Sequence, residues 1–194
     1  MNTAYTSSED FFEAKYRNTP DADPWSFATS EYELERYRVV MNALVGRRYR
    51  YAYEPGCSVG VLTQQLASVC DQIDACDFSA TAVEVARKRC QMLPGVNIRC
   101  AALSPNAPWS KFDLIVLSEI GYYFTADEWR AMVETMVNTM RPGTVLLASH
   151  WLGESADHMQ RGDEVHEAIS HPLLDCTLSK RHAGFRLDRW KRGK

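Results

Sequence analysis

The stretch that decides the fold is Glu54-Pro55-Gly56-Cys57-Ser58-Val59-Gly60. The residues before it, Tyr49–Glu54, have the pattern of a β-strand, and those at Val59–Val69 have the pattern of a helix. Gly56 permits a tight turn and a close approach of the backbone to a ligand, and Gly60 lets the next helix pack closely. This stretch therefore predicts a strand–turn–helix unit whose turn borders a binding site.

Strand-like and helix-like stretches alternate on the C-terminal side of this unit. Repeated alternation favours a parallel sheet with helices on both faces, and a short turn at residues 181–184 predicts a final antiparallel hairpin. We therefore expect an α/β, Rossmann-like fold with a mostly parallel seven-stranded sheet and an antiparallel C-terminal edge hairpin. The predicted strands are Gln72–Asp77, Asn97–Ala101, Phe112–Ser118, Gly143–His150, Leu173–Ser179 and Phe185–Trp190, and the predicted helices are Ala80–Leu93, Thr125–Met140 and Met159–Ile169.

Two helices are predicted ahead of the sheet, at Ser8–Arg17 and over residues 30–45. The Pro-containing stretch Asn18–Trp25 separates them. Ser30 and Glu33 fit a capping box, in which each side chain satisfies a free backbone amide at the start of the second helix.

Length and composition are those of one globular domain. The chain has 194 residues, of which 45% are hydrophobic and 24% are charged. Within this domain, we expect residues 1–48 to form an N-terminal helical segment and residues 49–194 to form the core. No apolar run is long enough for a membrane helix, and the polar N-terminus has no signal-peptide pattern. The six cysteines include no C-x-x-C pair, which favours reduced thiols. These features predict a cytoplasmic protein without a membrane partner.

The charge distribution limits the possible partners. A net charge of −3 does not favour nucleic-acid binding, although residues 180–194 carry seven Lys or Arg against one Asp. That segment is either a solvated basic hairpin or a contact for an anion or a substrate. No metal-binding spacing such as H-E-x-x-H is present, so we expect neither a nucleic-acid partner nor a metal site.

The predicted ligand site lies at the carboxyl ends of the strands, where sheets of this kind bind ligands. The turn after the first strand lacks the middle glycine of G-x-G-x-x-G, and Glu54 beside it would repel a phosphate. The site therefore suits a ligand with a cationic end. Asp77, 23 residues after Glu54, is a candidate for binding ribose hydroxyls. Its alternative role is a helix N-cap, which Ser79 could fill instead. Phe78 could pack on a purine.

At this point the chain resembles the class I S-adenosylmethionine-dependent methyltransferases. The resemblance covers roughly residues 49–150 and rests on four motifs in the order of that class. Within the class, two shorter stretches resemble the nodulation protein S (NodS) type. The four motifs are Glu54–Gly60, Asp77, Phe112–Val116 and Met140–Thr144, and the two shorter stretches are Asp23–Trp25 and Ser118–Phe124.

The resemblance implies how S-adenosylmethionine and its product S-adenosylhomocysteine would bind. The turn would carry the methionine part with Glu54 near its amino group, and Asp77 would hold the ribose. Adenine would lie beside Phe78. The acid that many such enzymes place after the third strand is absent, so backbone groups of Ala102 and Leu103 would serve the ring. The turn residues concerned are Gly56, Cys57 and Gly60.

The resemblance also makes residues 1–48 a lid over the cofactor, with Trp25 as a contact. Arg36 has two possible roles: it binds the methionine carboxylate, or it forms a surface ion pair with Glu33 three residues earlier. Ser118 and Glu119 end the fourth strand, where the reactive methyl group should lie.

The predicted catalytic residues are Glu119, Tyr122, His150 and His166. Glu119 is either a substrate or cofactor contact or a partner in a salt bridge to another helix. A Tyr122 hydroxyl can orient an acceptor, and Glu119, His150 or His166 could remove its proton.

The resemblance implies methyl transfer to a small molecule by in-line displacement. The NodS resemblance implies an amino-sugar or oligosaccharide amine as the acceptor. The alternatives are an O-methyltransferase acting on another small metabolite and a non-catalytic S-adenosylmethionine-binding subunit. A monomer or a homodimer is expected.

Overall fold

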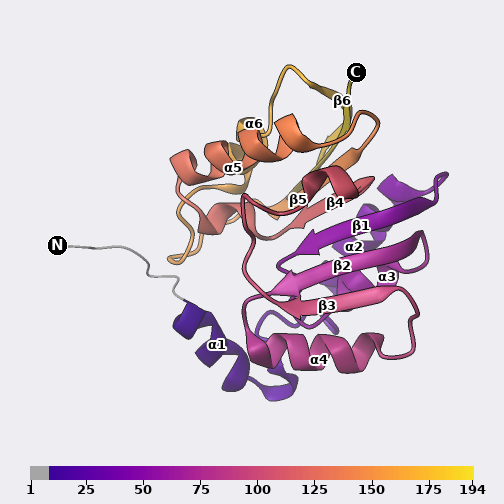
Figure 1. Cartoon of the computed structure of the whole chain (residues 1–194). Helices are drawn as coiled ribbons and strands as arrows, with labels where there is room; N and C mark the ends of the chain where they lie inside the picture. Colours follow the sequence, from indigo (N-terminus) through magenta and orange to yellow (C-terminus); the bar gives the residue numbers. More distant parts are fainter. Residues whose placement is uncertain (1–8) are drawn as a thin grey trace.

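The computed structural model describes residues 9–194 and contains a seven-stranded sheet in the order β3-β2-β1-β4-β5-β7-β6 (Figure 1). Strands β1 to β5 run parallel, whereas β7 is antiparallel to both β5 and β6. The predicted fold class, including the C-terminal edge hairpin, is confirmed. The strands are β1 (Tyr49–Pro55), β2 (Cys70–Asp77), β3 (Val96–Cys100), β4 (Leu114–Ser118), β5 (Val145–Trp151), β6 (Leu174–Arg181) and β7 (Phe185–Arg192).

Helices cover both faces of the sheet. One hydrophobic cluster packs α2, α3 and α4 against one face, and a second packs α5 and α6 against the other. Figure 1 shows α1 beyond the arrowheads of β1, β2 and β3, at the carboxyl edge of the sheet. The helices are α1 (Glu9–Arg17), α2 (Glu31–Leu44), α3 (Val61–Leu66), α4 (Ala80–Cys90), α5 (Ala126–Thr139) and α6 (Gly162–Ala168), with single 3-10 turns η1 (Pro20–Ala22), η2 (Trp109–Lys111) and η3 (Gly121–Tyr123).

The middle strands are buried on both faces, as expected for a parallel sheet between helices. In β4, Leu114 and Val116 join the cluster of α2, α3 and α4, whereas Ile115 and Leu117 join that of α5 and α6. Because successive side chains point to opposite faces, a continuous apolar run serves both layers. Full burial of each such side chain is worth about 1.5–3 kcal/mol before the entropy of ordering is subtracted.

Several predicted boundaries move, each for a local reason. The predicted helix start at Ser8 lies outside the described residues. The helix predicted from Met159 begins at Gly162 instead, because the preceding loop runs along the pocket. The Ser30–Glu33 capping box does not form. Ser30 is the N-cap but its side chain makes no capping hydrogen bond, and the carboxylate of Glu33 binds Arg36.

The basic C-terminal hairpin is engaged with the rest of the molecule. Arg181 and Arg186 form ion pairs with Asp163 on α6. Arg189 donates to the carbonyl of Ala43, and Arg192 donates to that of Val137. Within residues 9–194, no helix combines the length and the apolar character that crossing a bilayer requires.

Candidate functional site

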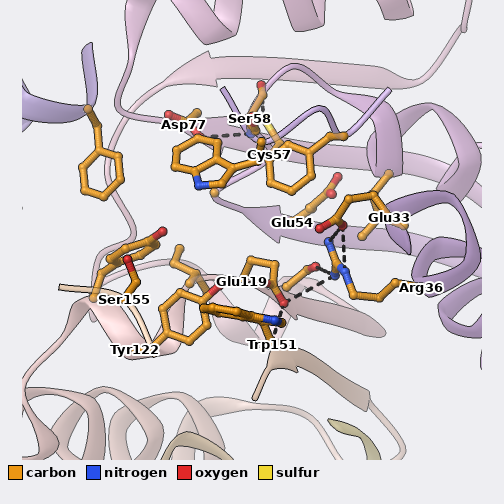
Figure 2. Close-up of a pocket in the computed structure, with 18 of the residues that line it drawn as sticks. Glu33, Arg36, Glu54, Cys57, Ser58, Asp77, Glu119, Tyr122, Trp151 and Ser155 are labelled. Atoms are coloured by element: carbon orange, nitrogen blue, oxygen red, sulfur yellow. Dashed lines mark hydrogen bonds and ion pairs between the residues drawn. The ribbon is translucent and has the colours of Figure 1, made fainter. Parts of the chain in front are cut away.

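A pocket of about 450 Å³ lies at the carboxyl ends of β1, β2, β4 and β5. Helices α1 and α2 contribute further walls through Phe12, Tyr16, Arg36 and Tyr37. Figure 2 shows Asp77, Ser58 and Cys57 on one side of this pocket, Glu119, Tyr122 and Trp151 on the opposite side, and the Glu33–Arg36 pair at one end. The acidic side chains that line it are Glu33, Glu54, Asp77, Glu119, Glu154 and Asp157.

Two glycines of the turn after β1 are required by geometry. Gly56 has φ +71°, and a Cβ there would lie 2.9 Å from Cδ1 of Ile120. Gly60 has φ +77°, and its Cβ would lie 2.9 Å from Cβ of Ala86 on α4. The absence of a side chain at Gly60 therefore lets α4 pack closely against this turn, whereas the prediction concerned the next helix in the chain, α3. Gly56 and Cys57 line the pocket, whereas Gly60 shapes the turn from outside it.

Glu54 is a buried carboxyl group with an unsatisfied oxygen. The residue is 2% exposed, and its Oε2 has no hydrogen-bond partner in the described chain. Burial raises the pKa of Glu54 to about 8. A buried carboxyl group stays protonated unless a cation or hydrogen-bond donors stabilise its charge. This side of the pocket can therefore hold a cationic group of a ligand.

Asp77 organises the same turn. Its Oδ2 accepts from the backbone N–H of Ser58, and its Oδ1 accepts from that of Ser79, each over 2.9 Å. Burial raises the pKa of Asp77 to about 6. The N-cap of α4 is Ser79, whose hydroxyl accepts from Ala82 N–H. Capping therefore does not require Asp77, which lines the pocket and whose carboxylate can accept further hydrogen bonds there.

Arg36 is fully buried and joins α2 to the far wall. Its Nε and Nη2 donate to one oxygen of Glu33 over 2.9 and 2.6 Å, and its Nη1 donates to Ser118 Oγ over 2.8 Å. Nη1 also lies 3.6 Å from Oε1 of Glu119. The predicted Glu33 pair exists, but it is not a surface ion pair, because Arg36 has no exposed area and lines the pocket.

Glu119 and Tyr122 form the core of the wall opposite Asp77. Glu119 has φ +56°, and its Oε1 accepts from the N–H of Trp151 over 2.9 Å. Its Oε2 accepts from the Tyr122 hydroxyl over 2.5 Å. Burial raises the pKa of Glu119, and the nearby Arg36 opposes that shift. The salt bridge from Glu119 to a helix therefore forms, and because Glu119 also lines the pocket, its contact with a substrate or cofactor stays a prediction.

His150 and His166 do not reach the pocket, which corrects the prediction that either removes a proton from the acceptor directly. They are 0% and 1% exposed and are absent from its lining. Nδ1 of His150 lies 3.1 Å from Nε2 of His166, and Nδ1 of His166 lies 2.8 Å from Oδ2 of Asp188. The physical reason is strand alternation, which turns His150 to the face covered by α6 while its neighbour Trp151 lines the pocket.

His158 lines the pocket instead, and the sequence patterns did not single it out as a proton acceptor. Its ring stacks on Tyr122 with centroids 3.8 Å apart. No described residue hydrogen-bonds to either ring nitrogen, and burial lowers its pKa. The signal that could have found it is its place in the loop after β5, beside a strand end that borders the site.

Most of the remaining predicted contact residues line the pocket, and one does not. Trp25, Phe78, Leu103 and Ser118 line the pocket. Ala102 does not, because it is exposed, and its neighbour Ala101 faces the pocket instead. The aromatic residues that the sequence patterns did not assign to the site are Phe12, Phe27, Tyr32, Tyr37 and Trp151.

Hydrogen bonds connect helix α1 to the start of α4 beside this pocket. The carboxylate of Glu13 accepts hydrogen bonds from the hydroxyls of Ser79 and Thr81 and from the N–H of Thr81. These bonds lower the pKa of Glu13 to about 2. A second link, from Lys15 to Asp157, spans 3.5 Å to the loop after β5.

Comparison with known proteins agrees with this architecture. Residues 9–162 match the family model described as nodulation protein S (NodS). Nodulation protein S of Bradyrhizobium diazoefficiens is 29% identical over 64% of this chain and 61% of its own length, and that of Rhizobium tropici is 25% identical over 70% and 58%. The chain thus spans about 60% of the length of the curated relatives it matches.

Two solved structures are similar over most of the chain. A putative methyltransferase from Pseudomonas syringae is 33% identical, with a TM-score of 0.72, over 84% of this chain and 100% of its own. The N-methyltransferase NodS from Bradyrhizobium japonicum, in complex with S-adenosyl-L-homocysteine, is 21% identical with a TM-score of 0.80 over 96% and 98%. The fold is therefore the Rossmann-like methyltransferase fold, and because the family model matches most of its length, this chain belongs to the nodulation protein S family.

Proposed function

We propose that this chain is an S-adenosylmethionine-dependent methyltransferase that transfers a methyl group to a small molecule. The observation that carries the proposal is the Glu54 carboxyl group, which is buried and unsatisfied at the end of β1 beside a glycine turn. Such a group suits the ammonium of a bound amino acid. A pocket lined by six acidic side chains and one arginine also favours the positive sulfonium.

The residues present fit this cofactor. Gly56 has φ +71°, a conformation that favours glycine, so a bare backbone borders that part of the pocket. Asp77 would hold the ribose hydroxyls, and Phe78 and Leu103 would flank the adenine. Four of the five guanidinium N–H groups of Arg36 are donated to Glu33, Ser118 and Ser149, and the remaining one on Nη2 would serve the methionine carboxylate. When bound, S-adenosylmethionine supplies a methyl group already activated on sulfur.

The contribution of the chain to the reaction is orientation and proton handling. Holding two reactants in line contributes roughly 7–11 kcal/mol to lowering a barrier. The Tyr122 ring and hydroxyl border the acceptor side of the pocket, and Glu119 fixes that hydroxyl. An amine acceptor must be neutral to attack and must lose a proton afterwards. His158 is a candidate proton acceptor there, because burial keeps its imidazole neutral.

An amine is the acceptor that the pocket chemistry favours. Acidic walls attract a protonated amine from solution, and a solved relative is described as an N-methyltransferase. We therefore propose N-methylation of an amino sugar or of an amine on an oligosaccharide. O-methylation of another small metabolite is the second candidate, since Tyr122 could orient a hydroxyl equally well.

The remaining features of the proposal concern organisation. We propose one domain in which residues 1–48 act as a lid, supported by the contacts of α1 and α2 with the pocket and of α1 with α4. A cytoplasmic monomer or homodimer without a nucleic-acid partner is the expected form.

Calorimetric titration with S-adenosylmethionine and S-adenosylhomocysteine tests the proposal, with Asp77→Ala as the comparison variant. Micromolar binding that is lost in the variant would support the cofactor site and justify an acceptor screen with glucosamine and partly deacetylated chito-oligosaccharides. Absence of binding to the wild-type chain would refute the proposal. Binding without turnover on any amine or hydroxyl acceptor would favour a non-catalytic binding subunit.

A further inference from the structure

A linear chain of buried polar groups lies behind the acceptor side of the pocket. It begins at the backbone N–H of Gly121, which lies 3.0 Å from Nε2 of His150. It continues from His150 to His166 and ends at Asp188 on β7, over 3.1 and 2.8 Å. All three side chains are at most 1% exposed, and none of them lines the pocket. Because these groups lie outside the pocket, direct proton transfer to or from a ligand does not explain this row of hydrogen bonds.

Only one arrangement of protons satisfies every contact. A backbone N–H can only donate, so Nε2 of His150 must accept from Gly121. Neutral His150 then carries its proton on Nδ1 and donates it to Nε2 of His166. His166 in turn carries its proton on Nδ1 and donates it to the carboxylate of Asp188. Both histidines are therefore neutral and carry their proton on Nδ1. The carboxylate of Asp188 accepts the last hydrogen bond and so fixes the direction in which the row donates.

The Gly121 amide belongs to a segment with a strained backbone, which its surroundings must stabilise. Two residues earlier, Glu119 has φ +56°, a conformation that a non-glycine residue adopts only when its surroundings enforce it. Gly121 is also held through its carbonyl, which accepts from Nε2 of Gln160 over 3.2 Å. A Cβ at Gly121 would lie 2.3 Å from Cγ1 of Val165, so the backbone is pressed against α6.

We propose that the Asp188–His166–His150 chain is a positioning device for the acceptor side of the site. By accepting from the Gly121 amide, His150 keeps the Glu119–Tyr122 pair in the arrangement that methyl transfer needs. The catalytic consequence rests on the proposed function, whereas the structural consequence does not.

The device depends on a neutral His150. A second proton would turn Nε2 into a donor facing the donor N–H of Gly121, and the segment would be released. The titratable groups that face His150 are His166, His158 and Tyr122, and the charged group is Arg36; of these, His166, Arg36 and His158 disfavour that proton. Burial also lowers the pKa of His150 well below its usual value. Around His166, Asp188 and Asp163 favour a proton, whereas burial and Arg186 oppose it.

Two matched variants test the hydrogen bond itself. The amide of Gln reaches the place of Nε2 in a histidine, whereas the amide of Asn reaches only the place of Nδ1. His150→Gln therefore keeps an acceptor for Gly121, and His150→Asn removes it while keeping the same functional group. We expect the amide of Gly121 to exchange with deuterium at the wild-type rate, within about threefold, in His150→Gln. In His150→Asn it should exchange at least about tenfold faster, as expected for a lost hydrogen bond. Both experiments use the full chain.

A spectroscopic readout covers the case in which a variant fails to fold. Nitrogen-15 NMR of the wild-type histidines should show His150 and His166 both neutral, with the proton on Nδ1. A proton on Nε2 of His150 would overturn the proposal, and so would equal exchange of the Gly121 amide in both variants.

Activity then tests the role in catalysis. The kcat of His150→Asn should fall by about tenfold, with S-adenosylhomocysteine affinity changed less than about threefold, and His150→Gln should restore kcat. Equal kcat values in the two variants would contradict the positioning role. If the protein binds no S-adenosylmethionine, the proposed function is refuted independently of this proposal. The exchange and NMR results still decide whether His150 positions Gly121.

Discussion

The hydroxyl group of Tyr16 lies 2.8 Å from Oγ of Ser58 and donates a hydrogen bond to it. This bond ties helix α1 directly to the turn after β1, whose Ser58 N–H is in turn held by Asp77. The N-terminal helix is therefore connected to the two groups that we assign to the cofactor. A movement of this turn on ligand binding would therefore be transmitted to α1 through the Tyr16–Ser58 hydrogen bond.

Removing this bond should weaken cofactor binding. A buried hydrogen bond contributes about 0.5–1.5 kcal/mol, so Tyr16→Phe should raise the Kd for S-adenosylhomocysteine by about two- to tenfold. Calorimetry measures the change. Tyr51→Phe is the matched control, because its hydroxyl binds Asp74 outside the pocket. A Kd that rises equally in both variants would count against a specific role of the Tyr16 bond.

Glu54 should release a proton when S-adenosylmethionine binds near neutral pH. The carboxyl group of the free protein has a pKa of about 8, so at pH 7 it is mostly protonated. A cationic ligand favours the ionised form, and affinity should therefore rise with pH up to about pH 8. Calorimetry in buffers of different ionisation enthalpy counts the proton. Glu54→Gln should abolish the release, and release that persists in this variant would point to another group.

The same carboxyl group should make the free protein less stable as pH rises. Its pKa is raised from 4.5 in the unfolded chain to about 8 in the folded one, so the unfolded state loses its proton first. Between these values stability falls by up to about 1.4 kcal/mol per pH unit, and the loss is complete above pH 8. Urea unfolding at pH 5 to 8 should show wild type losing stability relative to Glu54→Gln. Parallel curves for the two proteins would contradict the raised pKa.

Alanine substitutions at Gly60 and Gly143 should distinguish the destabilisation caused by overpacking from that caused by backbone strain. Both have positive φ, +77° and +85°, but a Cβ would meet Ala86 only at Gly60 and nothing within 4 Å at Gly143. Gly143→Ala should therefore cost about 1–2 kcal/mol from backbone strain alone. Gly60→Ala should cost a further 1–3 kcal/mol, roughly the penalty of overpacking. Thermal and urea unfolding measure both, and equal losses would show that α4 can move away.

The order of the elements could be predicted because each strand, turn and helix has a local signature. The turn at Gly56 and Asp77 at the end of β2 both carry such signatures, and both line the pocket. His150 was assigned to the site because it ends a strand, yet the strand-end rule does not say which face a side chain takes. Ser149 bonds toward Arg36, and His150 turns to the opposite face. That choice depends on register, which the pattern left open.

Arg36 shows a second limit of sequence patterns. Spacing on a helix predicts its partner Glu33, three residues away, and the pair does form. Spacing does not predict burial, which depends on how α2 packs against the ends of β4 and β5. Ser118 and Glu119 lie 82 and 83 residues away in the sequence and reach Arg36 only through the fold. Trp25 was predicted from the resemblance, but Phe12 and Phe27 were not, since aromatic side chains in a short N-terminal segment carry no periodic signal.

Replacing His158 should slow methyl transfer without weakening cofactor binding. Its imidazole lines the pocket against Tyr122, has no protein hydrogen-bond partner among the described residues, and has a lowered pKa, so it is neutral and open at pH 7. General bases contribute about 10²- to 10⁴-fold to rates, and His158→Gln should therefore lower kcat by at least about tenfold on an amine acceptor. The Kd for S-adenosylhomocysteine should change less than about threefold. His171→Gln, a change at a histidine paired with Glu134 outside the pocket, should leave both values unaltered. If His158→Gln retains wild-type kcat at pH 6 to 8, the proton leaves to water instead.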